Sequence, residues 1–565
     1  MNRTSPALLL LPLLALWWGS CQSERAVLPA ERLAPDRPNI LWIVAEDLSP
    51  VLPMYGDSTV RTPNLHRLVE RGTVYQNCFS PSPVCAPSRA ALATGMYPIS
   101  IGAHNMRTQW NRAYLNAVGL EPYEVVPPEG VRMLSERLRE HGYYCTNNAK
   151  TDYQFKPTLL AWDESSNYAH YRDRAPGQPF FAVFNLEVTH ESRLWMPASR
   201  DMLRFEADSF PDRRRPSTGF SDNIPTMRWN LPANHELPLP PYLIDDDSTR
   251  WTVRRAYSNI ITLDRQIGRL LDQLEEMGEL DRTIVFFYGD HGGPLPRQKR
   301  LLFDSGLRAP LIVSYPGSWD DGQRDSSLVS FVDFVPTVFE LTGVPLPDYL
   351  QGHSFADRKT PPRRYLHAAA DRFDAIPDRS RAVTDGRWKY IRNYHPERPY
   401  YPPITFRENI PAMRSLLRAR DAGTLSATQA LWFRTTKPAE ELFDTQFDPH
   451  EVRNLAGQPD YADKLVELRT EMDRFLAEVG DLGARSERAV VDGFQVDGKQ
   501  PPCTPPNRTA DGRVVSTTPG STVGFRRLDS VYVTENTWEI AGSILPADSV
   551  RLCVDRIGWI PWVEQ

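Results

Sequence analysis

The residue best suited to nucleophilic chemistry is the cysteine at position 85, in the segment Pro-Val-Cys-Ala-Pro-Ser-Arg before an expected helix. A lone cysteine in a globular protein is usually a buried core thiol. Burial alone does not require proline, serine and arginine at fixed positions after it. At roughly one in twenty per position, such a pattern arises by chance in well under about one chain in a hundred of this length. The pattern therefore indicates a chemical role for Cys85 and Arg89.

Three carboxylates and one imidazole form the second feature that can do chemistry. Glu46 and Asp47 follow an apolar run at 39–45, and Asp290 and His291 follow another such run. Clustered acids repel each other and raise one another's pKa unless a cation lies among them. Oxygen ligands with one imidazole suit a hard divalent ion, with Ca²⁺ as the first candidate and Mg²⁺ as the second. The alternative is that these are solvated loop residues.

The apolar runs predict the strands that must position these residues. A continuous apolar run is typical of a strand buried on both faces in a parallel sheet. Such runs occupy residues 39–45, 180–185, 283–288 and 309–315. Between two of them lies an amphipathic helix, whose apolar residues from Ile260 to Leu274 are spaced three and four apart. Strands alternating with helices predict a doubly wound α/β core over 37–364, with ligands at the carboxyl ends of its strands.

Two further patterns follow this core. Short strands and a charged amphipathic helix are expected at 382–383, 388–392 and about 460–479. They predict a smaller α+β subdomain over 365–482. After a proline-rich linker, residues 500–565 have short runs rich in Val, Thr, Tyr and Trp and predict a small β-sandwich, whose role is either glycan binding or packing. Cys503 and Cys553 there are either joined in a disulfide or two unpaired buried thiols.

The first 21 residues have the pattern of an export signal. Arg3 supplies a positive charge, and residues 7–18 are an apolar run too short to span a bilayer as a helix. The sequence Gly-Ser-Cys at 19–21 resembles the lipobox of bacterial lipoproteins, whose cysteine is acylated. We expect an exported protein, either periplasmic or anchored to the outer membrane only through a lipid on Cys21. The alternative is a plain secretory signal with an incidental cysteine.

The overall composition excludes several classes of protein. A net charge of −6 offers no basic excess for nucleic acid or for an anionic membrane surface. Hydrophobic residues at 41% and charged residues at 24% exclude a disordered chain. Proline makes up 51 of the 565 residues, about 9% against roughly 5% in average usage, and this excess predicts long ordered loops. Six cysteines are too few for a disulfide scaffold.

The segment around Cys85 resembles the signature of the type I sulfatases, Cys-x-Pro-x-Arg. Other stretches in the same order extend the resemblance over about 37–480, and the spacing from Asp290 to Lys299 is similar to that of bacterial N-sulfoglucosamine sulfohydrolase (heparan N-sulfatase)-like members. These stretches are 62–65 with Gly72, 289–292, 441–444, 448–449 and 454–455. The resemblance implies an alkaline-phosphatase-like α/β fold with a smaller C-terminal subdomain. One departure is Glu46, where the family commonly has aspartate; the added methylene shifts how this carboxylate would bind.

The resemblance also implies that a maturase oxidises Cys85 to Cα-formylglycine (3-oxoalanine) during export. The hydrated aldehyde is a gem-diol, of which one hydroxyl attacks sulfur and the other later expels sulfate. A divalent ion lowers the pKa of the attacking hydroxyl. Its implied ligands are Glu46, Asp47, Asp290, His291 and residue 85. By the same resemblance, Arg89 holds the hydrated residue and Asp290 is the base of the first step.

Further residues are candidates for binding the sulfate and the sugar. Lys150 resembles the sulfate-binding lysine of the family, and Lys299 is a second candidate cation. His190, just after an expected strand, is a candidate acid for the leaving group. The family commonly has histidine where this chain has Asp152, which would orient Lys150 or bind a substrate hydroxyl or amine. The candidates for contact with the sugar are His104, Asp152 and Arg372. For each of these residues the alternative is an ordinary surface or capping role.

These observations together predict an exported sulfatase that hydrolyses sulfate esters or sulfamates of a sulfated glycan. Two alternatives stay open: a phosphonate monoester or phosphodiester hydrolase of the same fold, and a catalytically inactive glycan-binding lipoprotein. The sequence does not fix the sugar, the sulfated position, exo or endo action, or the oligomeric state.

Overall fold

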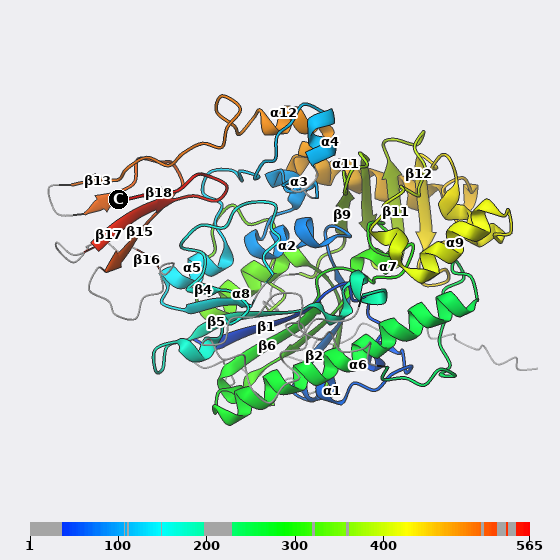
Figure 1. Ribbon diagram of the computed structural model, residues 1–565, viewed down its shortest axis with the longest axis horizontal. Coiled ribbons are helices and arrows are strands. Elements are labelled where there is room, and N and C mark those ends of the chain that lie inside the picture. Colours follow the sequence, from blue (N-terminus) through cyan, green and yellow to red (C-terminus); the bar gives the residue numbers. More distant parts are fainter. Residues whose placement is uncertain are drawn as a thin grey trace, which may run out of the picture. The chain divides into compact units, whose positions relative to one another are not determined.

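Eight strands form the central sheet, in the order β4-β3-β5-β1-β6-β7-β2-β8 (Figure 1). Their bounds are Asn39–Ala45 (β1), Gly72–Phe79 (β2), Tyr144–Asn148 (β3), Glu164–Ser165 (β4), Phe180–Leu186 (β5), Thr283–Gly289 (β6), Arg308–Ser314 (β7) and Gln323–Ser330 (β8). Three predicted runs form β1, β5 and β6, and β1 pairs in parallel with both β5 and β6. The fourth run forms β7, which is antiparallel to β6 and β2 and so corrects the expectation of a parallel strand. A continuous apolar run reports burial on both faces, which an antiparallel strand inside a mixed sheet also has.

Helices cover both faces of this sheet (Figure 1). Their bounds are Pro63–Glu70 (α1) and Asp247–Glu276 (α6) on one face, and Cys85–Thr94 (α2), Leu134–Glu140 (α5) and Phe334–Thr342 (α8) on the other. Side chains of β1 alternate between the two cores. Leu41 and Ile43 pack with α1 and α6, whereas Trp42 and Val44 pack with α2, α5 and α8. The predicted doubly wound α/β core is confirmed, and this coverage explains why β1 is apolar from Ile40 to Ala45.

A second, antiparallel sheet has the strand order β12-β11-β10-β9. Its strands are Leu366–Ala370 (β9), Ser380–Thr384 (β10), Trp388–Asn393 (β11) and Glu440–Asp444 (β12). The helix α11 (Ala462–Val479) packs on it, with Leu468 and Met472 against Tyr390 and Leu442. The remaining helices are Pro98–Ile101 (α3), Arg112–Ala117 (α4), Asp304–Leu307 (α7), Pro411–Asp421 (α9), Ala427–Ala430 (α10) and Glu487–Val491 (α12). The predicted smaller α+β region is therefore present.

The terminal segment is all-β and packs on the α5–β3 region. Its strands are Asn507–Arg508 (β13), Val514–Val515 (β14), Thr522–Arg527 (β15), Glu539–Ile540 (β16), Val550–Asp555 (β17) and Trp562–Val563 (β18). They form a two-stranded sheet, β13-β14, and a four-stranded sheet, β16-β15-β17-β18. The Thr522 hydroxyl donates to Glu136 over 2.6 Å, and Asp555 accepts the Leu159 N–H over 2.7 Å. Cys503 and Cys553 are separate buried thiols, the second of the two alternatives.

The computed structural model describes residues 37–106, 108–109, 112–148, 150–196, 229–318, 322–356, 361–509, 513–527, 538–540 and 550–564. The expected export signal at 1–21, with Cys21, lies outside the described residues. In the described part of the chain, no helix is both long enough and apolar enough to cross a bilayer. Residues 34–565 form one compact unit by their contacts, and the subdivisions at 364, 482 and 500 stay predictions.

Candidate active site

The parallel pairing of β1 with β6 brings the predicted metal ligands together. Ala45 and Gly289 face each other in register, so the residues that follow them leave the sheet at the same edge. The backbone N–H of Asp47 donates to the Asp290 carboxylate over 2.9 Å. The predicted ligands from both strand ends have no solvent exposure: Glu46, Asp47, Asp290 and His291.

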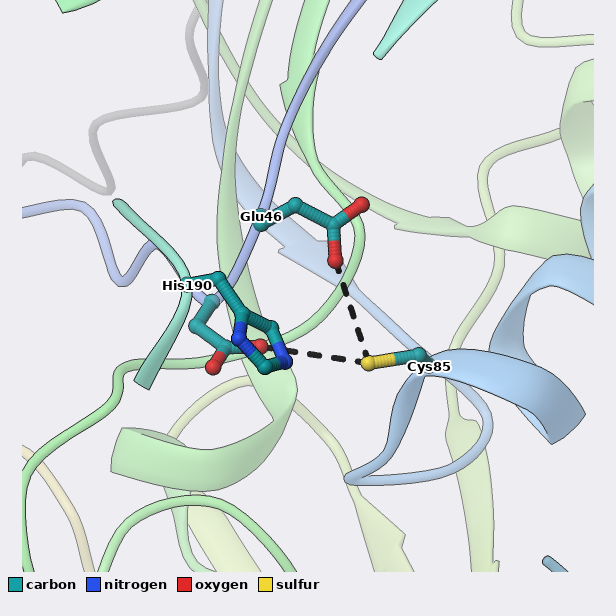
Figure 2. A group of neighbouring side chains, drawn as sticks. Glu46, Cys85 and His190 are labelled. Atoms are coloured by element: carbon teal, nitrogen blue, oxygen red, sulfur yellow. Dashed lines mark hydrogen bonds between the residues drawn. The ribbon is translucent and has the colours of Figure 1, made fainter. Parts of the chain in front are cut away.

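Cys85 begins α2 and directs its sulfur into this cluster (Figure 2). Its Sγ lies 3.9 Å from the carboxylates of Glu46 and Asp47 and 3.4 Å from Nε2 of His291. Two overlapping sets of ligand atoms each lie within 4.8 Å of one another: Glu46, Asp47, Cys85 and His190, and Asp47, Cys85, Asp290 and His291. Three of the six residues in these sets are carboxylates, the oxygen donors that a hard divalent cation prefers, so this cluster fits such an ion.

Residues on both sides of Cys85 hold the start of α2 in place through hydrogen bonds. The Ser88 hydroxyl donates to the Asp290 carbonyl, and the carbonyl of Pro83 accepts the N–H of Arg300 over 2.8 Å. Gly95 ends α2 with φ of +72°, and a Cβ there would meet Leu350 at 2.6 Å. The sequence pattern thus contains residues that orient the helix as well as residues that face the site.

Three cations from three elements neutralise the buried carboxylates. Arg89 on α2 makes a short hydrogen bond to Glu46, and Lys150, after β3, donates to the same carboxylate over 2.6 Å. Lys299 Nζ lies 2.8 Å and 3.0 Å from the two oxygens of Asp47 and 3.3 Å from the sulfur of Cys85. These predicted site residues therefore converge at one place.

The charges divide the carboxylates into two kinds. Burial raises the pKa of Glu46 to about 7; Arg89 and Lys150 lower it, but the charges of Asp290 and Asp47 act in the same direction as burial. Burial also disfavours ionised Asp47, but Lys299 and neighbouring histidines lower its pKa well below the ordinary value. In the metal-free protein Glu46 is therefore the carboxyl that most readily holds a proton.

His190 lies beside Asp47 and Lys299 at the end of β5. Its Nδ1 accepts a hydrogen bond from the N–H of Ser192 over 3.3 Å, and Nε2 lies 3.5 Å from Nζ of Lys299. Burial, with the charge of Lys299, lowers the pKa of His190 to about 3. The ring is therefore neutral at pH 7 and directs Nε2 toward the cluster.

Sequence reasoning missed an ion-pair network behind the site. Glu191 donates its N–H to Asp47 over 2.7 Å, and its carboxylate accepts two hydrogen bonds from Arg300, over 2.9 Å and 2.8 Å. Arg300 continues to Asp374 over 3.1 Å. Asn185 on β5 accepts from Arg89 over 2.6 Å. Glu191 and Arg300 directly follow the predicted His190 and Lys299, which is the signal that could have found them.

Two of the residues predicted to contact the sugar, Arg372 and His104, are buried. Arg372 is buried and forms a two-point ion pair with Glu487, with both hydrogen bonds at 2.7 Å. His104 is also buried, 4% exposed, and burial lowers its pKa. Asp152 lies 3.8 Å from Nζ of Lys150, close enough to orient it, and its side chain is 35% exposed.

The sequence profile named Sulfatase matches residues 38–174 and 160–344, which is more than half of the chain. The chain belongs to the sulfatase family. A second profile, N-sulphoglucosamine sulphohydrolase, C-terminal, matches residues 291–400, in agreement with the predicted branch.

Relatives of this sulfatase extend over most of its length. An ulvan-active sulfatase of Formosa agariphila is 46% identical over 542 residues, covering 93% of this chain and 90% of the relative. An N-acetylglucosamine-6-O-sulfatase of Bacteroides thetaiotaomicron is 24% identical over 82% of this chain and 90% of its own. A protein solved with its substrate, D-glucosamine-2-N,6-O-disulfate, has a TM-score of 0.55 at 20% identity, covering 80% of this chain and all of that one. The last similarity confirms the alkaline-phosphatase-like fold.

The pair of Glu191 with Arg300 should stabilise the sulfatase in a pH-dependent way. Burial disfavours the charge of Glu191, but Arg300 and Lys299 lower its pKa from 4.5 to about 2. A lowered pKa stabilises the fold above pH 4.5, and this contribution is lost as the pH falls toward 2. We expect Glu191→Gln to reduce the free energy of unfolding at pH 7 by about 3 kcal/mol, because Arg300 and Lys299 each lose one of the buried carboxylates that balance their charge.

The measurement is urea unfolding of both proteins at pH 7, 4.5 and 3. The difference should shrink below pH 4.5, because Glu191 of the unfolded wild-type chain is then protonated whereas the folded protein keeps it ionised down to about pH 2. Glu187→Gln, in the preceding 3₁₀ turn (Glu187–Thr189) and half-buried, is the matched control and should change stability by less than about 1 kcal/mol. An equal difference at all three pH values would contradict the assignment.

Proposed function

We propose that this enzyme removes sulfate from the sulfated polysaccharide ulvan. The observation that carries the substrate is the 46% identity to an ulvan-active sulfatase over 93% of the chain. The observation that supports the chemistry is the contact of Cys85 with buried carboxylates, a histidine and Lys299. A thiol placed there for packing alone would not need four ionisable neighbours.

The nucleophile in this proposal is a hydroxyl of hydrated formylglycine at position 85, which a formylglycine-generating maturase makes from Cys85. The hydroxyl oxygen forms a bond to sulfur while the bond from sulfur to the sugar oxygen breaks. Asp290 takes the proton of this hydroxyl, since its lowered pKa leaves it ionised at neutral pH. The second hydroxyl then loses its proton, the carbonyl re-forms, and sulfate leaves; water hydrates the aldehyde for the next cycle.

The surrounding side chains bind the sulfate and assist the leaving sugar. Lys150 and Lys299 already pair with Glu46 and Asp47, so both ammonium groups lie where sulfate oxygens would gain charge balance. Arg89 holds the hydrated residue 85. The neutral ring of His190 donates a hydrogen bond from Nε2–H to the leaving oxygen, because Nδ1 accepts from Ser192. The sugar oxygen takes its proton from water, and the proton held by Asp290 returns to solvent.

A divalent cation, with Ca²⁺ as the first candidate and Mg²⁺ as the second, fits the cluster of oxygen donors. The residues that would hold it are Glu46, Asp47, Asp290, His291 and residue 85. When bound, the ion supplies a lower pKa for a hydroxyl of residue 85 and polarises a sulfate oxygen. It also offsets the two effects that raise the pKa of Glu46, burial first and then the repulsion from Asp290 and Asp47.

Replacement of Cys85 tests the nucleophile and the substrate together. Wild-type enzyme from a host with the maturase should release sulfate from ulvan oligosaccharides, and mass spectrometry of the Cys85 peptide should show the aldehyde. Cys85→Ala should lower turnover by at least about 10³-fold while the protein stays folded and binds Ca²⁺. Cys78→Ala, a buried thiol in β2, is the control and should stay within about threefold of wild type. An unmodified thiol in active enzyme would refute the mechanism.

The titration of Glu46 should make cation binding depend on pH. Below pH 7 a divalent ion must displace the proton from this carboxyl, because its pKa is about 7 in the metal-free protein. We expect the affinity for Ca²⁺, measured by calorimetry after chelation with EDTA, to fall about tenfold between pH 8 and pH 6. Glu46→Gln should bind more weakly and lose most of this dependence, whereas Glu164→Gln should behave as wild type. An affinity that is equal at both pH values would contradict the assignment.

We also propose export to the periplasmic side, with a lipid on Cys21 as the anchor. The support is the charged residue Arg3, the apolar run at 7–18 and the lipobox-like residues at 19–21. In the native host the protein should fractionate with membranes and incorporate labelled palmitate, and Cys21→Ser should release it into the soluble periplasm. Recovery of the wild-type protein in the cytoplasm would contradict export.

A further inference from the structure

The residues around position 85 differ sharply in their access to solvent. Glu46, Asp47, Asp290 and His291 have none, and Lys299 is 3% exposed. By contrast, the side chains of Lys150 and Asp152 are 17% and 35% exposed, and His190 is half-buried. Among the described residues of the site, these three therefore border the approach for a substrate.

Two aromatic side chains extend this border outward from His190. The ring of Phe406 lies 6.3 Å from the His190 ring at an interplanar angle of 55°. The ring of Trp195 lies 5.0 Å from that of Phe406 at 79°, an edge-to-face contact. Both residues are half-buried, so each ring keeps part of its surface open to solvent. We name Trp195 and Phe406 the aromatic platform.

The chain on either side of the platform is held firmly. Trp195 directly follows the 3₁₀ turn Glu191–Leu194, whose last residue is fully buried. Phe406 directly precedes Arg407, which is 2% exposed and lies over the rings of Tyr401 and Trp432 at 5.1 Å and 4.8 Å. The two rings are therefore fixed in place before a ligand arrives, which lowers the entropy cost of binding to them.

We propose that the aromatic platform binds the sugar ring that carries the sulfate under attack. The inference rests on the proposed function, in which the sugar oxygen departs next to Nε2 of His190. A sugar attached to that oxygen must lie against the groups that border His190, of which Phe406 is the aromatic one, and Trp195 packs in turn against Phe406. Sugar rings present apolar C–H faces that pack on aromatic faces, while their hydroxyls stay free for polar partners such as Asp152.

The test measures binding, so that it does not depend on turnover. In the Cys85→Ala background with Ca²⁺ present, sulfated ulvan oligosaccharides and inorganic sulfate are titrated separately by calorimetry. Phe406→Ala and Trp195→Ala should each weaken oligosaccharide binding about threefold to tenfold and leave inorganic sulfate binding within about twofold. Phe406→Tyr keeps the ring and should bind as the background does, whereas Phe406→Leu keeps only apolar volume and should resemble alanine.

The matched control is Phe447→Ala, which removes a ring that is 77% exposed and belongs to the loop after β12. Unchanged oligosaccharide binding in Phe406→Leu and in both alanine variants would overturn the platform, and so would an equal weakening of inorganic sulfate binding. Failure of the proposed function looks different: Cys85-containing enzyme would then release no sulfate from the same oligosaccharides, while the binding comparison still decides the platform. Melting temperatures of all variants identify any loss that comes from misfolding.

Discussion

The structure depends on the confinement of three carboxylates at one edge of the central sheet. Parallel pairing of β1 with β6 brings Glu46, Asp47 and Asp290 together in one buried site, where ionised carboxylates repel each other strongly. Cations from elements far apart in sequence balance this negative charge, among them Arg89 on α2 and Lys299 in the loop after β6. These ion pairs thus assemble the site and also hold α2 and the loop after β6 against the edge of the central sheet.

Much of this arrangement could be predicted, because it follows from strand ends. An acid directly after a buried strand has few places to lie, and Cys85 carries its own local pattern, so the convergence of Cys85 with Asp47 and Asp290 was accessible from the sequence. The direction of β7 was not, since an apolar run reports burial and gives no direction. The contact of Glu191 with Arg300 joins two loops 109 residues apart, and no periodicity marks such a pair.

For residues in loops, the sequence likewise does not reveal which distant residues they contact. Arg372 lies in a polar loop, which is equally compatible with a binding role and with an ion pair, and its described partner, Glu487, is 115 residues away. Phe406 drew no attention because single aromatic residues in loops are common. Its significance comes only from its distance to His190, a tertiary fact. Site residues that follow strands were thus easier to find than those that loops bring together.

The terminal strands have a consequence for how the protein is made. Asp555, at the end of β17, accepts the N–H of Leu159, and Thr522 on β15 donates to Glu136 on α5. These partners lie beside the strand that leads to Lys150, about four hundred residues earlier in the chain. The ribosome must therefore pass residue 555 before these two contacts with the catalytic core can form. A stop codon just before position 522 would leave every residue of the site encoded, yet it would remove both contacts.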